Sequence, residues 1–266
     1  MRHLRLFSMA AMTSILLLVA WPSAITTVPY DRQFRDYPSA PISRQFPLGT
    51  DELGRDRLSR LLHATRISLV AAPAAALLST ALAAIAGGLA GFLGGRFDRM
   101  AAVVIDLMLA LPWLFVLIIV RAALPLNIEA WLSVGITFGL IGLLGWPSAA
   151  RVVRAGCQDL RNSDLVLHAR ACGIAPGRIL LKHVLPNLRP VLVAQFWAAI
   201  PIYILAEANL GLLGLGVSEP LPSWGNLLRP LETAFLAPAE AWTPLALMLV
   251  VVACLYVCKP VEVATR

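Results

Sequence analysis

Long apolar segments constrain the fold of this chain more than any other feature of its sequence. A helix that crosses a lipid bilayer needs about 20 mostly apolar residues. Only 14% of the 266 residues are charged and 59% are hydrophobic, whereas a soluble domain carries about 25% charged residues. The sequence therefore predicts an all-α membrane protein with six transmembrane helices. The predicted spans are 9–28, 67–92, 100–120, 130–147, 191–216 and 241–258.

The Lys and Arg residues between the spans indicate the orientation, because they concentrate in cytoplasmic loops. With the N-terminus inside, thirteen lie on the cytoplasmic side and nine outside. Arg2 and Arg5 before the first span would also suit a cleaved signal peptide, but the five further spans favour an uncleaved anchor. We therefore expect both termini in the cytoplasm. The predicted parts are an N-terminal transmembrane helix (1–30), an external segment (31–66), a five-helix core (67–258) with a cytoplasmic loop (151–190), and a cytoplasmic tail (259–266).

Charge and cysteine usage exclude several classes of function. The net charge is +7, but the basic residues lie between apolar segments without interleaved aromatic residues, so no nucleic-acid partner is expected. Cys254 and Cys258 stand four residues apart without a His or carboxylate at ligand spacing, so we predict no metal site. The sequence holds no phosphate-binding loop and no catalytic cluster. We therefore expect a subunit that is not an enzyme.

Glycines recur every four residues near the end of the second span, at Gly87, Gly91 and Gly95. On a helix this spacing gives one flat face that a neighbouring helix can approach closely. The neighbour could belong to this chain or to a partner, and chance glycines in an Ala-rich helix are the alternative.

The stretch from Phe46 to Leu69 forms a first motif. Gly49 and Gly54 bracket an acidic turn, in which Asp51 and Arg55 can pair. We predict an external loop that folds into a short helix at the membrane surface.

The longest polar interval, 151–190, holds a second motif. A helix is predicted to start at Asp164 and to stop at Gly173, with Leu165, Ala169 and Cys172 on one face. A second helix is predicted from Pro176 through Val184, followed by a break at 185–187. The alternative is a basic connector without a partner.

A third motif, 210–228, follows the fifth span. Gly211, Gly214 and Gly216 are expected to loosen the end of that span, and Trp224 is placed as an interfacial aromatic residue. We predict a structured outer loop.

Together with GFLGGRFDR at 91–99, these motifs resemble those of the second-type permease of dipeptide, oligopeptide and nickel ABC importers. The resemblance covers about residues 46 to 228. Leu167 stands where the family has Glu, His168 where it has Ala, and Lys259 to Arg266 lacks the family's acidic ending. The matching stretches are Gly49 to Asp56, Gly91 to Arg99, Ala169 to Gly173 with His183 to Asn187, and Leu212 to Val217 with Pro222 to Asn226.

This resemblance implies a type I ABC importer permease fold in the bacterial inner membrane. The chain would form half of a peptide pathway, with 31–66 in the periplasm. The implied partners are a homologous second permease, ATP-binding subunits and an extracytoplasmic substrate-binding protein, besides the lipid bilayer. ATP and Mg would bind to partner subunits, so no cofactor is expected in this chain. The alternatives are a nickel or metallophore permease and a stand-alone secondary transporter, although we find no paired broken helices typical of the latter.

The candidate residues form two groups. Asp106 and Glu207 lie within predicted spans, where ionisable groups are functional candidates; we favour a structural role or a hydrated pathway over contact with substrate. The residues predicted to couple the chain to the ATP-binding subunit are Asp164, His168, Ala169, Arg170, Gly173 and Pro176. The residues predicted to be structural or to line the pathway are Asp51, Gly54, Arg55, Asp106, Glu207, Gly214, Gly216 and Trp224.

Overall fold

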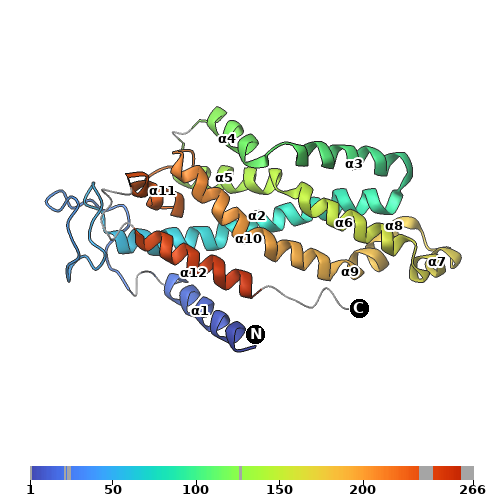
Figure 1. The fold of residues 1–266 in the computed structure, drawn as a ribbon, viewed down its shortest axis with the longest axis horizontal. Helices are drawn as coiled ribbons and strands as arrows, with labels where there is room; N and C mark the ends of the chain where they lie inside the picture. Colours follow the sequence, from blue (N-terminus) through green and yellow to red (C-terminus); the bar gives the residue numbers. More distant parts are fainter. Residues whose placement is uncertain (1, 21, 23–24, 126–127, 234–241, 259–266) are drawn as a thin grey trace. The chain divides into compact units, whose positions relative to one another are not determined.

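The regular secondary structure of the described residues is helical (Figure 1). The computed structural model describes residues 2–20, 22, 25–125, 128–233 and 242–258. Two isolated β-bridges, Gln33 with Arg55 and Thr50 with Asp56, are the only β-pairing in these residues. The helical elements are α1 (Arg2–Ala20), α2 (Arg57–Leu93), α3 (Gly95–Ala110), α4 (Trp113–Ala123), α5 (Ala130–Leu144), α6 (Trp146–Arg161), α7 (Asp164–Ala171), α8 (Pro176–Ile179), the π-helix η2 (Leu180–Val184), α9 (Leu185–Asn187), α10 (Arg189–Leu212), α11 (Trp224–Leu228), the 3₁₀-helix η3 (Arg229–Thr233) and α12 (Thr243–Val257).

Several of these helices are long and apolar enough to cross a membrane. Three stretches qualify by length and composition: α2, α5 together with α6, and α10. A fourth qualifies if α3 and α4 are counted as one span bent by 78°. The apolar part of α1 (Ser8–Val19) and α12 are shorter. The expectation of an all-helical membrane protein is therefore confirmed, and six complete spans stay a prediction.

Prolines explain where the observed helices differ from the predicted spans. The third predicted span is broken at Pro112, because a proline has no N–H to donate and its ring crowds the preceding turn. The first was predicted through Val28, but α1 ends at Ala20, shortly before Pro22. The fourth runs on to Arg161, because Pro147 lies in the first turn of α6, where a proline is tolerated. Ala241, where the sixth was predicted to begin, lies outside the described residues.

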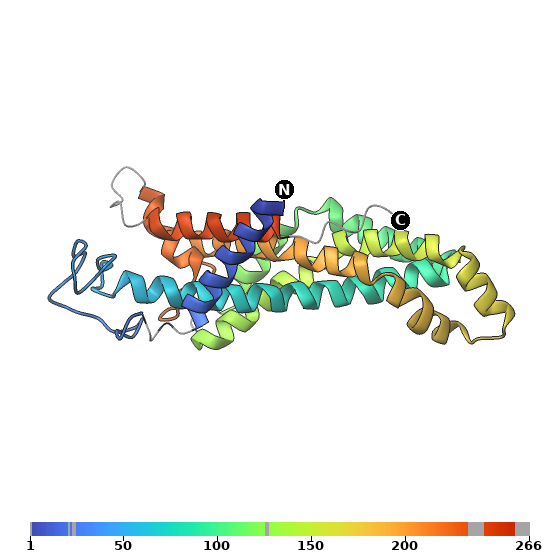
Figure 2. The ribbon, with the colours of Figure 1, turned by 90° about the horizontal axis from the view of Figure 1, so that it is seen from below.

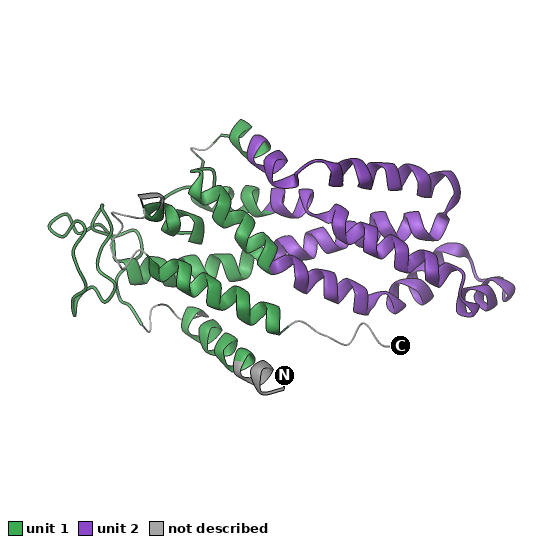
Figure 3. Ribbon diagram, viewed as in Figure 1, with its two compact units in different colours: residues 1–72, 120–138, 201–258 green, residues 73–119, 139–200, 259–266 purple. Residues whose placement is uncertain are grey.

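The chain divides into two compact units (Figure 3). Unit 1 consists of residues 1–72, 120–138 and 201–258, and unit 2 of residues 73–119, 139–200 and 259–266. The boundaries in α2 and α10 fall at the prolines inside these helices, Pro73 and Pro201. Each proline removes one helical hydrogen bond, so these two boundaries fall at weaker points of the helices.

In unit 1 an irregular external segment leads into α2. The rings of Phe34 and Tyr37 pack on Phe46, with centroids 5.1 and 5.8 Å away. The buried Asp56 accepts a hydrogen bond of 3.0 Å from the backbone N–H of Ser59, which caps α2. Burial raises the pKa of the Asp56 carboxyl, while its hydrogen bonds oppose this shift. The surface helix predicted here as a separate element is the first part of α2, which begins at Arg57.

Unit 1 also contains α1, α11 and α12. Both α1 and α11 pack against α12 (Figure 1). The apolar face of α12 includes buried Met248, Val251 and Leu255. The C-terminal part of the chain is thereby tied to its N-terminal helix within one unit.

In unit 2, helix α6 packs against α3 and against the end of α2. Gly87 and Gly91 face the backbone of α6: a Cβ at Gly87 would collide with the Ala150 carbonyl oxygen, and one at Gly91 would lie 2.6 Å from that of Arg154. Gly95 does not take part, because it has a φ of 61° beyond the end of α2 and nothing within 4 Å. The predicted stripe is thus two glycines long, and its neighbour is α6 of the same chain.

Candidate functional site

The helix pair predicted as the coupling element lies in unit 2, at the turn that follows α6 (Figure 2). Helix α7 begins at Asp164, as predicted. It ends in a Schellman turn, in which Gly173 donates to the Arg170 carbonyl (2.9 Å) and Ile174 donates to that of Ala169 (3.2 Å). Gly173 has a φ of 72°, and nothing lies within 4 Å of its missing Cβ. The glycine is therefore required by the backbone conformation and not by a lack of space.

The inner face of this pair is anchored in an apolar core. Val166 and Ala169, three residues apart on one face of α7, are buried. Of the three residues predicted to share one face, Ala169 is buried, whereas Leu165 and Cys172 are exposed. The core is made of Phe92, Val153, Cys157, Val166, Ala169, Ile179, Val184 and Leu188.

Three leucines of the pair are exposed. Leu165, Leu167 and Leu181 have 45%, 51% and 66% of their surface exposed. Exposed apolar side chains are available for contact with another protein. We call these three residues the exposed leucines.

Two polar residues of α7 have contacts within unit 2. The Nδ1 of His168 lies 2.7 Å from the Asp164 carbonyl oxygen. The guanidinium of Arg170 lies 5.9 Å from the ring centre of Phe92, so it stacks on the end of α2. Both His168 and Arg170 are exposed to solvent and remain accessible to a partner.

The second helix of the pair does not break where the sequence predicted. Pro176 lies in the first turn of α8, as expected, but 185–187 is the helix α9, which leads through Leu188 into α10. The π-helix η2 immediately before it has wider turns than an α-helix. Pro186 therefore falls in the first turn of a new α-helical segment, where its missing N–H is tolerated.

An ion-pair network in unit 1 joins the first motif to the third. Asp51 accepts from the Nε of Arg55 at 2.6 Å, and Arg55 donates through Nη1 to Glu219 at 2.7 Å. Arg60 is only 2% exposed and reaches the same Glu219 at 2.9 Å. Gly54, with a φ of 71°, lets the turn pass the Phe34 carbonyl. The predicted pair of Asp51 and Arg55 is thus part of a larger network centred on Glu219.

Neutralising Glu219 is expected to destabilise unit 1. Glu219→Gln leaves the buried Arg60 with only Asp51, at 3.8 Å, as a counter-charge, so we expect the free energy of unfolding to fall by about 1–2 kcal/mol. Thermal or urea unfolding of the detergent-purified chain measures this. Glu52→Gln changes an exposed acid on the same turn and is the matched control. Equal stability of the two variants would show that the network contributes nothing.

Three glycines bring the end of α10 against the third motif. A Cβ at Gly211 would collide with Gly225, and one at Gly216 would lie 2.7 Å from the Cα of Gly211. Gly214, with a φ of 73°, closes α10 in a second Schellman turn, with Leu215 donating to the Leu210 carbonyl at 2.8 Å. The glycines were expected to loosen the end of the fifth span, and this expectation is wrong. They end the helix four residues before the predicted Gly216 and hold it in close backbone contact.

Glu207 and Trp224 are both fully buried beside this contact. The carboxylate of Glu207 lies next to Ser223 and the backbone N–H of Gly225, without a fully formed hydrogen bond to either. The indole N–H of Trp224 donates to the Thr65 hydroxyl at 3.1 Å. Trp224 is therefore a core residue and not the predicted interfacial one, because the motif folds back and gives its N–H a partner within the protein.

Asp106, in contrast, is exposed in unit 2. It pairs with Arg151 at 2.5 Å, and both side chains are more than half exposed. A better buried pair lies nearby on the same two helices, where Arg154 donates to Asp98 at 2.5 and 2.7 Å. Asp106 thus contributes to the contact of α3 with α6.

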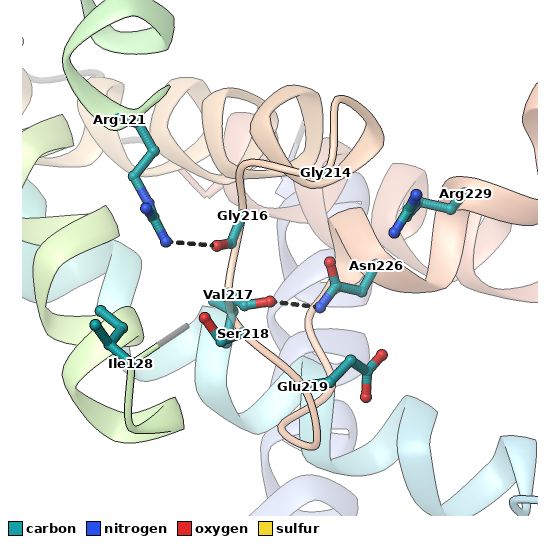
Figure 4. Close-up of a pocket in the computed structure, with 9 residues that line it drawn as sticks. All are labelled: Arg121, Ile128, Gly214, Gly216, Val217, Ser218, Glu219, Asn226 and Arg229. Atoms are coloured by element: carbon teal, nitrogen blue, oxygen red, sulfur yellow. Dashed lines mark hydrogen bonds between the residues drawn. The ribbon is translucent and has the colours of Figure 1, made fainter. Parts of the chain in front are cut away.

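A cavity of about 370 Å³ opens beside the third motif in unit 1 (Figure 4). Arg121, at the end of α4, is fully buried and donates through Nη2 to the carbonyl of Gly216 and the hydroxyl of Ser133, both at 3.2 Å. The cavity is lined by Arg121, Ile128, Gly214, Gly216, Val217, Ser218, Glu219, Asn226 and Arg229.

Of these residues, the sequence reasoning selected only Gly214 and Gly216. Arg121 was counted only as an external charge, and Glu219 was not singled out. Glu219 is the one acidic residue between Gly214 and Leu228, which was the available signal. In the described residues no group of three or more His, Cys, Asp or Glu could hold a metal ion.

The sequence is similar to those of several membrane transport proteins. The di/tripeptide transport system permease protein of Pseudomonas aeruginosa is 38% identical over 210 residues, which are 75% of this chain and 67% of that protein. The oligopeptide transport system permease protein of Haemophilus influenzae is 32% identical over 82% of this chain and 71% of its own length. The dipeptide transport system permease protein of Bacillus subtilis is 34% identical over 73% of this chain and 59% of its own length. The chain thus spans less than two thirds of this Bacillus relative.

The helices and motifs define a membrane-embedded transport subunit rather than an enzyme. Residues 61–258 match the family described as the inner membrane component of binding-protein-dependent transport systems, and the chain belongs to that family. The resemblance drawn from the sequence motifs is confirmed.

Proposed function

We propose that this chain is a permease subunit of a bacterial ABC importer for peptides and forms half of the translocation pathway. Support for the peptide substrate comes from the relatives, whose names specify dipeptides, di/tripeptides or oligopeptides. These names favour peptides over the nickel or metallophore alternative.

The observation that carries the coupling role is a helix pair that is anchored in the core of unit 2 and carries the three exposed leucines. Val166 and Ala169 fix the pair to the core of unit 2, while Leu165 and Leu167 point away from it. A stiff element can transmit a rigid-body movement, whereas a free loop cannot. In the proposal, the exposed leucines and the polar residues of α7 dock on an ATP-binding subunit. Because Leu167 replaces the family's Glu, apolar packing takes the place of one charged contact.

The proposed assembly has a second, homologous permease, two ATP-binding subunits and an extracytoplasmic substrate-binding protein. ATP and Mg bind to the ATP-binding subunits, and this chain needs no cofactor of its own. In the inner membrane the chain has six spans and cytoplasmic termini. Its parts are the N-terminal transmembrane helix (1–30), the periplasmic segment (31–66), the five-helix core (67–258) and the cytoplasmic tail (259–266). The residues of the tail, 259–266, lie outside the described part of the chain.

Reconstitution of the complete assembly in proteoliposomes tests the proposal. We expect uptake of a radiolabelled dipeptide or tripeptide and peptide-stimulated hydrolysis of ATP. Leu167→Asp places a charge in a surface that becomes buried, which is strongly unfavourable, so stimulated hydrolysis should fall about 10-fold or more. Arg170→Glu should act in the same direction.

The matched control is Ile42→Asp, which alters an exposed aliphatic residue of the external segment (60% exposed) and should leave hydrolysis unchanged. If Leu167→Asp leaves peptide-stimulated hydrolysis of ATP unchanged, the helix pair is only a connector between the spans. Uptake of nickel in place of peptides would overturn the proposed substrate.

A further inference from the structure

The cavity beside the third motif contains a buried cation without a counter-charge. The Nη1 of Arg121 donates to the Pro125 carbonyl at 3.4 Å, and its Nε has no hydrogen-bond partner. Within the described residues no carboxylate lies at ion-pairing distance from it. An arginine side chain stays charged at all physiological pH values, and the three oxygen atoms that accept hydrogen bonds from Arg121 are all neutral, so its buried charge has no counter-charge. The geometry therefore calls for an anion in this cavity.

The remaining charges of the cavity favour an anion as well. Glu219 also lines it, but its carboxylate is held by Arg55 at 2.7 Å and Arg60 at 2.9 Å, so it is neutralised from the other side. Arg229 supplies a second, exposed guanidinium. Asn226 is fixed by a hydrogen bond of 2.7 Å to the Val217 carbonyl (Figure 4).

The size of the cavity limits the ligand. Sites for small molecules usually measure about 300–1,000 Å³, and this cavity measures about 370 Å³. It can take a terminal carboxylate with one or two residues attached. The Nε–H of Arg121 has no partner and can donate a charge-assisted hydrogen bond to a carboxylate.

We propose that Arg121 and this cavity form a binding site for the C-terminal carboxylate of a peptide. The assignment of the ligand as a peptide rests on the proposed function, whereas the anion site rests on the geometry of Arg121 alone. In the predicted orientation Arg121 lies toward the external side, where a peptide arrives. The site would then select linear peptides with a free C-terminus.

Ligand binding to the purified chain in a phosphate-free sugar detergent tests the site. Trialanine and N-acetyl-trialanine, which both keep the carboxylate, should bind, and trialanine amide should bind about 10-fold more weakly, because it lacks the charge-assisted hydrogen bonds. Saturation-transfer NMR measures this on the unaltered chain. Equal binding of acid and amide, or no binding of either, would overturn the proposal.

Variants then assign the contact to Arg121. Arg121→Gln should bind trialanine as weakly as the unaltered chain binds the amide. If this variant does not fold, Arg229→Gln, on the exposed side of the cavity, should still weaken trialanine about 3-fold and leave the amide unchanged, as expected for a partly screened charge. Arg44→Gln removes an exposed external charge away from the cavity and is the control. An effect of Arg44→Gln equal to that of Arg229→Gln would mean that only net charge matters and would overturn the site.

Two further measurements separate the possible outcomes. Displacement of trialanine by inorganic phosphate but not by acetate would identify a phosphate site, as for a lipid headgroup, and overturn the carboxylate assignment. In the reconstituted assembly, equal KM for the acid and the amide would overturn carboxylate recognition while leaving peptide transport intact. Loss of both uptake activities would instead contradict the proposed function, and with it the peptide ligand.

Discussion

A chain with Gly87→Val is expected not to reach its folded state. The new side chain would collide with the backbone of α6, at the Ala150 carbonyl and 3.0 Å from the backbone N of Arg154. Overpacking of a well-packed interior costs about 1–3 kcal/mol when side chains can adjust. Here the obstacle is backbone, so we expect a loss at or above the top of that range, and little monodisperse protein after detergent extraction.

The neighbouring glycine supplies the control. Gly88 is on the same helix, but a Cβ there would meet only the Cδ1 of Leu185, at 3.8 Å. Gly88→Ala should therefore give wild-type yield and an unchanged or slightly higher unfolding temperature, since alanine favours the helix by up to about 1 kcal/mol. Similar yields of Gly87→Val and Gly88→Ala would show that α2 and α6 do not touch at Gly87.

The second large effect is expected from Gly211→Val, at the end of α10. Its side chain would collide with Gly225 and separate α10 from the third motif, which carries Trp224 and Glu219. We expect unit 1 to lose its fixed packing, so that proteolysis within 210–228 becomes rapid. Gly135→Ala is the control, because nothing lies within 4 Å of that position. If Gly211→Val resists protease, the close backbone contact between Gly211 and Gly225 is contradicted.

Local signals in the sequence were sufficient for much of the fold. The start of α7 at Asp164 agrees with the preference for an acidic residue in the first turn of a helix. Its end before Gly173 follows from the preference of glycine for a positive φ. The apolar cores of α2 and α10 follow from length and composition alone. The bend at Pro112 was missed although the proline is visible, because a helix in a membrane often tolerates a proline and hydropathy does not register it.

The contacts that build the candidate sites are of another kind. Arg60 and Glu219 are 159 residues apart, and no local pattern indicates that they meet. Arg121 contributes to a loop charge count in the sequence, whereas its burial depends on the way the third motif folds back on α4 and α5. Trp224 was misplaced for the same reason. The burial and the partners of these residues depend on contacts between segments that are far apart in the chain. A single sequence gives no information on such contacts.

The π-helix η2 lies in the connection between the helix pair and α10, and it affects how these helices can rotate relative to each other. From Pro176 to Leu212 the chain is helical except for the turn at Leu188. A π turn is equivalent to an α-helix with one residue inserted, and each α-helical residue advances the helix by about 100°. If η2 changed to α-helix, α8 would rotate about its own axis relative to α10 by roughly that step. Such a change would alter the rotation of the helix pair relative to α10 by one discrete step, whereas a flexible loop would impose no fixed step.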